Sequence, residues 1–350
     1  MQDHWTPDRL EAERVVRYAE LRPCTNAFVD TYTPGSDQKE NFTIIGPGVA
    51  EHPDQHVHIS EPHGFNIGGA RQPPGCTNSQ HSHLTEEVFV VYRGTWAFRT
   101  GDESQDGEII LQPGDCISIP TNVFRGFENV GDDVGYLFAV LGGDDPGSVL
   151  WAPDVFSGAE KHGLVLLENS RLVDTTRGEA IPDGLSPMPP TTQAQVAAHD
   201  RLGSDALVTI VATVDEQRAS QGSRLTNDAE GVREFPVIGE ACEGEAIAAG
   251  KLAWTHGFHL RRLEIDAGAA IGAHHRAEKE VLFVFEGELT VDSDAGSLSL
   301  GSGDVMTVPE GMERSFSNHG ESTAVVFVVR GGDQPSAPVF HLAGAETAAH

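Results

Sequence analysis

The sequence contains an internal repeat. The tripeptide His63-Gly64-Phe65 recurs as His256-Gly257-Phe258. The same offset aligns four more residues of the first half with the second: Gly75 with Gly268, His81 with His274, Glu87 with Glu280 and Gly94 with Gly287. After a hairpin that is shorter in the second half the match resumes, with Arg125 aligned to Arg314. Repetition on this scale indicates a domain that has been duplicated within the chain.

Both halves consist of short segments of β-forming residues. In the first half, runs of β-branched and aromatic residues occupy 88–92, 95–98, 116–119 and 136–141, separated by glycine, proline, asparagine and aspartate. Many short strands at nearly regular spacing are typical of a β-barrel or β-sandwich. Helices are expected only outside the repeats, after Thr6 and near 155–162 and 191–202.

Composition excludes several classes of function. The chain has 350 residues, enough for two domains, and a formal charge of −30 from 53 acidic and 23 basic residues. This charge argues against nucleic acid or an anionic membrane as a partner. No apolar run reaches the roughly 18 residues of a membrane span. The four cysteines show no CxxC spacing and no secretory signal is visible, so we expect reduced thiols in a cytoplasmic protein.

One stretch carries the pattern of a metal site. His81 and His83 are two positions apart, so on a strand both point to the same face, and Glu87 lies a further even number of positions along. Two imidazoles and a carboxylate that converge suit a divalent metal of borderline to hard character. The pair His56 and His58 lies in a proline-bounded segment, where we favour surface or inter-subunit packing.

The spacing around these residues resembles the two motifs of the cupin superfamily. The first motif is glycine, five residues, His-x-His, three or four residues, glutamate, six residues, glycine, and 75–94 fits it throughout. In the second motif Gly114, Pro120 and Asn129 fit, whereas Asn122 replaces a glycine and Arg125 replaces the histidine. The resemblance implies an all-β bicupin, with two jelly-roll barrels in tandem and a partly helical connector.

The second half fits the same motifs with two exchanges. Arg276 stands where the second histidine belongs, and Arg314 replaces the last histidine. Two guanidinium groups would repel a divalent cation, so we expect no metal there. The domain boundaries that follow are 1–62 for an N-terminal helix and arm, 63–145 for the first barrel, 146–240 for a linker with short helices, and 241–340 for the second barrel.

The resemblance makes His81, His83 and Glu87 metal ligands and leaves the fourth ligand missing. Such a set favours iron(II), with manganese, nickel, zinc or copper as alternatives. Two roles remain open for Arg125: an ion pair with Glu87 that replaces the metal, or a contact that holds an anionic substrate. His63 could be a ligand, a water contact or an acid/base group, or it could cap a turn, as its recurrence as His256 suggests.

Three functions fit this sequence. The first is a metal-dependent oxidoreductase, a dioxygenase that acts on a small oxygenated or acidic substrate in the first barrel. The second is an isomerase, epimerase or hydrolase, in which His63 or His81 could act as base. The third is a metal-free protein that binds a small acid through Arg125, Arg276 and Arg314. The expected partner is a small molecule, with a homodimer as the assembly to test.

Overall fold

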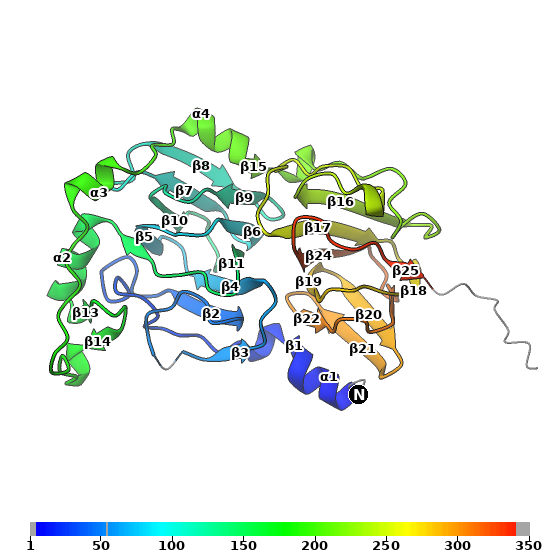
Figure 1. The fold of residues 1–350 in the computed structure, drawn as a ribbon, viewed down its shortest axis with the longest axis horizontal. Coiled ribbons are helices and arrows are strands. Elements are labelled where there is room, and N and C mark those ends of the chain that lie inside the picture. The colour runs from blue at the N-terminus through cyan, green and yellow to red at the C-terminus, as the bar shows by residue number, and fades with distance from the viewer. Residues whose placement is uncertain (1–4, 54, 341–350) are drawn as a thin grey trace, which may run out of the picture. The chain divides into compact units, whose positions relative to one another are not determined.

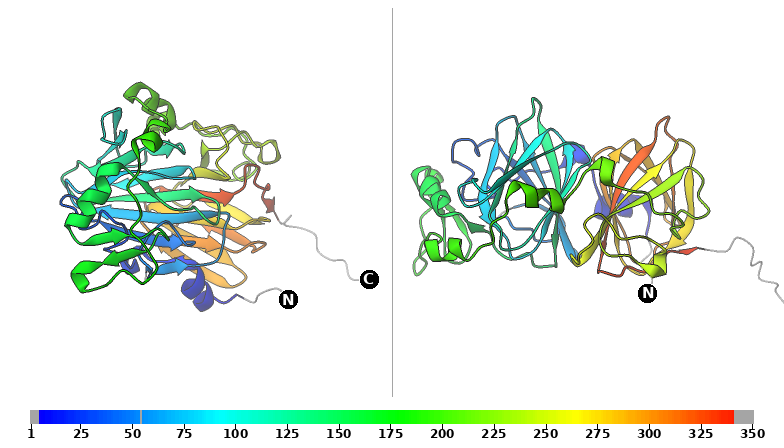
Figure 2. Two further views of the ribbon diagram at one scale, coloured as in Figure 1. Left: turned by 60° about the vertical axis from the view of Figure 1, so that its left-hand side comes forward. Right: turned by 90° about the horizontal axis from the view of Figure 1, so that it is seen from above.

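The computed structural model describes residues 5–53 and 55–340. It divides into an N-terminal unit, Arg22–Glu216, and a C-terminal unit that combines Met1–Leu21 with Gln217–His350. Each unit is a jelly-roll-like barrel of two facing β-sheets (Figures 1 and 2), which confirms the predicted all-β fold with two barrels. Within the described ranges, no helix is long and apolar enough to cross a membrane.

The N-terminal unit packs a seven-stranded sheet on a five-stranded sheet. The strand orders are β15-β9-β6-β11-β4-β2-β3 and β12-β5-β10-β7-β8. The strands of the barrel are β2 (Glu40–Ile45), β3 (Val57–Ile59), β4 (Phe65–Gln72), β5 (Thr77–Ser82), β6 (Glu87–Arg93), β7 (Trp96–Thr100), β8 (Gly107–Leu111), β9 (Cys116–Ile119), β10 (Arg125–Asn129), β11 (Gly135–Gly142), β12 (Leu150–Trp151) and β15 (Val211–Ala212). The chain crosses from the smaller sheet to the larger between β5 and β6, so the predicted metal motif spans both sheets.

The C-terminal unit repeats this arrangement with a six-stranded and a five-stranded sheet, and only β3 has no counterpart among its described strands. Its sheets have the orders β1-β22-β19-β24-β17-β16 and β21-β20-β23-β18-β25. The strands are β1 (Val15–Val16), β16 (Val232–Ile238), β17 (Phe258–Ile265), β18 (Ala270–His275), β19 (Glu280–Glu286), β20 (Glu288–Ser293), β21 (Gly296–Gly301), β22 (Val305–Val308), β23 (Arg314–Ser317), β24 (Ala324–Gly331) and β25 (Val339–Phe340). The duplication therefore extends beyond the motifs that are visible in the sequence.

The helices lie outside the repeated strands, as expected. The α-helices are α1 (Pro7–Arg14), α2 (Pro153–Lys161), α3 (Gln193–Ala197) and α4 (Ser204–Leu207), and a separate hairpin follows α2, with strands β13 (Leu164–Leu166) and β14 (Leu172–Asp174). Helix α1 begins at Pro7 because the side chain of Thr6 accepts a hydrogen bond from the amide of Arg9. Helix α3 is shorter than the predicted segment at 191–202.

The compact units differ from the domain boundaries proposed from the sequence. Residues 1–62 do not form one arm, because β1 pairs with β22 in the C-terminal unit and β2 pairs with β4 in the N-terminal unit. Residues 146–240 are likewise divided, since β15 pairs with β9 and β16 pairs with β17. In each barrel, backbone hydrogen bonds to these additional strands satisfy a sheet edge that would otherwise be open.

Motif glycines occupy turns that another residue would strain. Gly94 has φ +83°, and a Cβ there would lie 2.8 Å from Cα of Gly135. Its counterpart Gly287 has φ +80°, and a Cβ there would lie 3.0 Å from Cα of Ala324. Positive φ and a close backbone neighbour together explain why the motif requires glycine at this position in both halves.

Candidate metal centre

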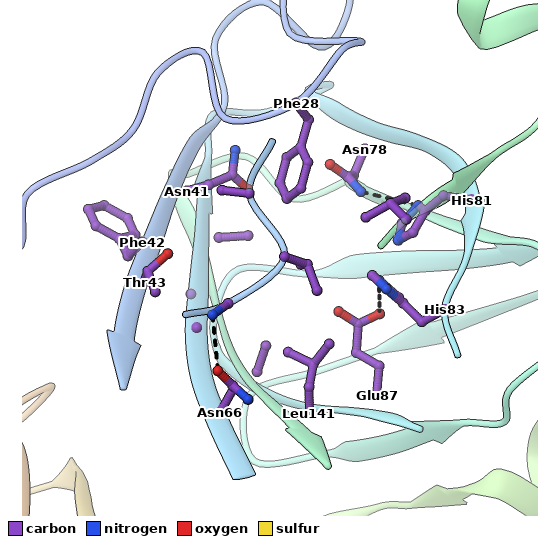
Figure 3. Close-up of a pocket in the computed structure, with 18 of the residues that line it drawn as sticks. Phe28, Asn41, Phe42, Thr43, Asn66, Asn78, His81, His83, Glu87 and Leu141 are labelled. Carbon is purple, nitrogen blue, oxygen red and sulfur yellow. Dashed lines mark hydrogen bonds and ion pairs between the residues drawn. The ribbon is translucent and has the colours of Figure 1, made fainter. Parts of the chain in front are cut away.

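Three predicted ligands come together inside the N-terminal barrel. His81 lies on β5, His83 directly follows that strand, and Glu87 begins β6. One ligand atom from each lies within 4.8 Å of the other two, and all three residues are buried (Figure 3). Among residues 5–53 and 55–340, this is the only group of three such side chains that could hold a metal ion.

Local contacts give His81 the form that a metal requires. Its Nδ1 lies 2.7 Å from the carbonyl oxygen of Ser79, so Nδ1 carries the proton and Nε2 keeps its lone pair. Burial, and then the positive charge of Arg125, lower the pKa of His81 to about 3. The imidazole is therefore neutral at neutral pH.

His83 has a ring nitrogen with no hydrogen-bond partner. Its Nδ1 is buried and unpaired, whereas Nε2 lies 3.5 Å from Oε2 of Glu87. Burial, Arg125 and His81 all lower the pKa of His83 well below its ordinary value. A neutral, buried imidazole with an unsatisfied nitrogen is costly unless something binds it, and a metal ion would do so.

Arg125 lies against Glu87, beside His81 across the β5–β10 pairing. Its Nη2 and Nε lie 3.0 and 3.3 Å from Oε2 of Glu87, and Nη1 donates to the carbonyl oxygen of Val123 at 3.3 Å. Burial raises the pKa of Glu87 and lowers that of Arg125, while the attraction between them opposes both shifts. All contacts of Glu87 use Oε2, which leaves Oε1 without a partner among the described residues.

Two buried groups that the sequence did not single out lie behind His81. The ring of Trp151 is 5.3 Å from the ring of His81, and its Nε1 donates to Oε1 of Glu51 at 2.7 Å. Burial raises the pKa of Glu51 to about 8. On the other side, Lys39 pairs with Asp30 and donates to Oδ1 of Asn78 at 2.9 Å.

The ligands face a small cavity with mainly apolar walls. Its volume is about 70 Å³, and its lining includes Phe28, Phe89, Phe127, Leu141, Val149 and Trp151 (Figure 3). Among the described residues that line it, the only titratable side chains are His81, His83 and Glu87. Arg125 lies behind Glu87 and does not line the cavity.

His63 lies outside this group. Nδ1 of His63 is 2.7 Å from the carbonyl oxygen of Glu61, and the equivalent Nδ1 of His256 is 2.8 Å from that of Trp254. Both histidines thus contact the backbone two residues earlier, at the start of the same strand in each barrel. This repeated contact favours the turn-capping role over the catalytic role for His63.

The corresponding place in the C-terminal barrel is filled by ion pairs. Nη2 of Arg314 lies 2.5 Å from Oε2 of Glu280, and Nε of Arg276 lies 3.3 Å from Oε1. Burial alone would raise the pKa of Glu280, but Arg314, Arg276 and Arg330 hold it at about 2. Arg276 and Arg330 also contact Glu245. Guanidinium groups thus occupy the surroundings of Glu280, and their positive charge would oppose a divalent cation there.

A comparison with protein families agrees with this geometry. The cupin domain matches residues 70–141 and, a second time, residues 261–330. The chain is a bicupin. A comparison with curated proteins found no match.

Solved structures of similar fold include oxalate decarboxylases. One is the enzyme of Lactobacillus farciminis in complex with formate, which is 10% identical in sequence and has a TM-score of 0.55. The alignment covers 94% of the bicupin and 88% of that chain. Another is that of Bacillus subtilis at pH 4.6, with 13% identity, coverages of 94% and 78%, and a TM-score of 0.53. A further structure of the Bacillus subtilis enzyme, described for its Mn(II) centres, has 12% identity, coverages of 94% and 79%, and a TM-score of 0.53. At these identities the similarity shows the fold of the bicupin and not its activity.

Proposed function

We propose that the N-terminal barrel is a metal-dependent enzyme that oxidises a small, mainly apolar compound bound through an oxygen atom. The observation that carries the proposal is the three-ligand group at the wall of an apolar cavity that has no other titratable lining side chain. In such a cavity the metal ligands form one polar end, where the reacting atoms of the substrate would bind. The uncharged side chains of the remaining wall would contact the rest of the substrate.

The residues fit a divalent metal. His81 presents an unprotonated Nε2, His83 has an unsatisfied Nδ1, and Glu87 has an oxygen without a partner. Bound there, the metal would supply Lewis acidity, redox chemistry and coordination positions open to a substrate oxygen and to dioxygen. Iron(II) is the metal that we favour, with manganese as the first alternative because of the Mn(II) centres of the similar fold.

The protein's own contribution is to select by size and exclude water. A cavity of about 150 Å³ takes benzene, so one of about half that volume suits a compound smaller than benzene, with fewer than six non-hydrogen atoms. Phe28, Leu141 and Trp151 provide its apolar contacts. Chemistry that needs an additional acid or base has no candidate side chain in this lining, which favours oxidation over isomerisation or hydrolysis.

Decarboxylation of a small acid is the second candidate. It is favoured by the similarity in fold to oxalate decarboxylases, which extends over 94% of this chain and over 88% and 78% of two of those chains. Loss of carbon dioxide leaves a carbanion that takes up one proton, and since the described lining has no further acid, water would supply that proton. Arg125 is held by Glu87 and Val123, so any carboxylate would be bound chiefly at the metal.

One experiment separates the two candidates. Protein purified without chelator is supplied with short-chain carboxylic acids, 2-oxo acids and enolisable ketones, while dioxygen and carbon dioxide are followed together. The proposal expects dioxygen to be consumed in stoichiometry with the substrate, and no turnover under argon. Release of carbon dioxide under argon would instead show that the protein is a decarboxylase and would overturn the proposed oxidation. If the His81→Ala variant were as active as the wild type, neither candidate would stand.

A further inference from the structure

The N-terminal site has no protein charge left to balance a metal ion. Glu87 and Arg125 form a buried ion pair whose charges cancel, and His81 and His83 must be neutral to bind a metal ion. The four side chains therefore sum to zero. The side chain of Arg125 is 0% exposed and that of Glu87 is 7% exposed, so bulk salt screens their charges only weakly.

The next shell of buried residues does not supply the missing charge. Asp30 and Lys39 are fully buried and cancel each other. Glu51, whose pKa burial raises to about 8, is mostly protonated at neutral pH. A divalent ion at the site would thus leave a net charge of +2 in a region of low dielectric, which is costly without a counter-ion.

The C-terminal barrel shows how this fold balances buried charge when it can. There Glu245 accepts from Arg261, Arg276 and Arg330, so the surplus guanidinium groups share a buried carboxylate. Glu280 in turn is shared by Arg276 and Arg314. The N-terminal barrel has no carboxylate equivalent to Glu245 among the residues that line its cavity.

The cavity itself can hold the counter-ion. Across the cavity from His83 and Glu87 lies Asn41, whose Nδ2 is a buried donor with no hydrogen-bond partner (Figure 3). A small oxygen anion bound to the metal would therefore share its cavity with an amide donor that has no other partner. The volume of about 70 Å³ limits the anion to a small one, and the apolar walls require the rest of it to be uncharged.

We propose that the N-terminal site binds its divalent metal together with a small monoanionic oxygen ligand, a carboxylate or an enolate, and binds either one only weakly alone. Because the proposed substrates belong to this class, the inference rests on the proposed function and adds to it a mutual dependence of metal and substrate. Such a dependence must be reciprocal: the anion strengthens metal binding by the factor by which the metal strengthens anion binding.

The test uses two probes of equal size. Metal-free full-length protein is titrated calorimetrically with Mn²⁺ at constant ionic strength, in the presence of acetate or of acetamide. Acetate and acetamide have the same number of non-hydrogen atoms, but only acetate carries a charge. We expect acetate to tighten Mn²⁺ binding by about 10- to 100-fold, within the usual range of couplings between sites, and acetamide to leave it unchanged.

Variants at the paired arginines provide the control. Arg125→Gln removes one positive charge, so Mn²⁺ should bind more tightly without acetate and the acetate effect should shrink. Arg314→Gln, at the equivalent position of the other barrel, should change neither value. Arg125→Lys retains the charge and should retain the acetate effect, which covers the case in which Arg125→Gln does not fold.

The outcomes separate this inference from the proposed function. Equal Mn²⁺ affinity in acetate and in acetamide overturns the inference alone, since the metal still binds. An acetate effect that persists in Arg125→Gln at full size also overturns it. Failure of Mn²⁺ and of Fe²⁺ to bind the wild type under any of these conditions overturns the inference and the proposed function together.

Discussion

Arg125 and Glu87 form a buried ion pair, with Nη2 of the arginine 3.0 Å from Oε2 of the glutamate. Arg314 and Glu280 repeat this pair in the second barrel. The pair is therefore common to both sites and does not by itself distinguish them. The difference lies at one position, where His83 faces Glu87 in the first barrel and Arg276 faces Glu280 in the second.

The first prediction compares the two pairs. Arg125→Ala leaves buried Glu87 without its guanidinium partner, which typically costs about 3–5 kcal/mol of stability, whereas Glu280 in Arg314→Ala keeps Arg276 and should lose less. In Arg125→Ala, added Mn²⁺ should restore the stability because the metal takes the place of the guanidinium. In Arg314→Ala it should not, because Arg276 remains beside Glu280. Urea unfolding with and without Mn²⁺ measures the free energy of unfolding of both variants. Equal rescue of the two variants would refute the assignment of one metal site.

The second prediction concerns Arg125→His. This change restores the histidine of the second motif, adds a fourth ligand and removes a positive charge. Metal affinity should rise by about tenfold or more, and turnover should fall because a position open to substrate becomes occupied. Calorimetry and steady-state rates test the two parts, with Arg125→Ala as the variant that removes the charge without adding a ligand. Unchanged turnover at higher affinity would show that the position is not used by substrate.

The sequence predicted the parts of the site that repeat. The aligned glycines located both barrels. The motif that contains them also identified His81, His83 and Glu87, which lie together in the structure. The role of Arg125 could not be chosen from the sequence, because its contact with Glu87 depends on how β5, β6 and β10 are placed in two facing sheets.

Other features could not be predicted because they depend on long-range pairing. Glu51 lies in an irregular segment, and its partner Trp151 is 100 positions away in the sequence. The two-residue strands β1 and β15 carry no periodic pattern of their own, and only their pairing with β22 and β9 makes them strands. A short segment gives too little local signal to reveal such a partner.

The third prediction concerns Glu51 and pH. In the unfolded chain Glu51 ionises near pH 4.5, whereas burial raises its pKa in the folded chain to about 8. The folded state thus binds more protons between these values, so its stability falls as pH rises from about 4.5 to 8, by at most about 1.4 kcal/mol per pH unit. Glu51→Gln cannot ionise and should escape this loss.

Urea unfolding at pH 5, 6.5 and 8 checks the predicted pH dependence of stability. Relative to the wild type, Glu51→Gln should gain stability steadily as pH rises, while Glu160→Gln, an exposed change on α2, should not. Stability curves of wild type and Glu51→Gln that run parallel from pH 5 to 8 would show that Glu51 is ionised in the folded protein.

The central claim is that one barrel of this bicupin holds a metal and the other does not. Elemental analysis of protein purified without chelator tests it most directly, on the wild type and on His81→Ala, His83→Ala and His274→Ala. We predict one divalent ion per chain in the wild type and in His274→Ala, and none in the other two variants. Two ions per chain, or metal retained after the loss of His81 or His83, would contradict the claim.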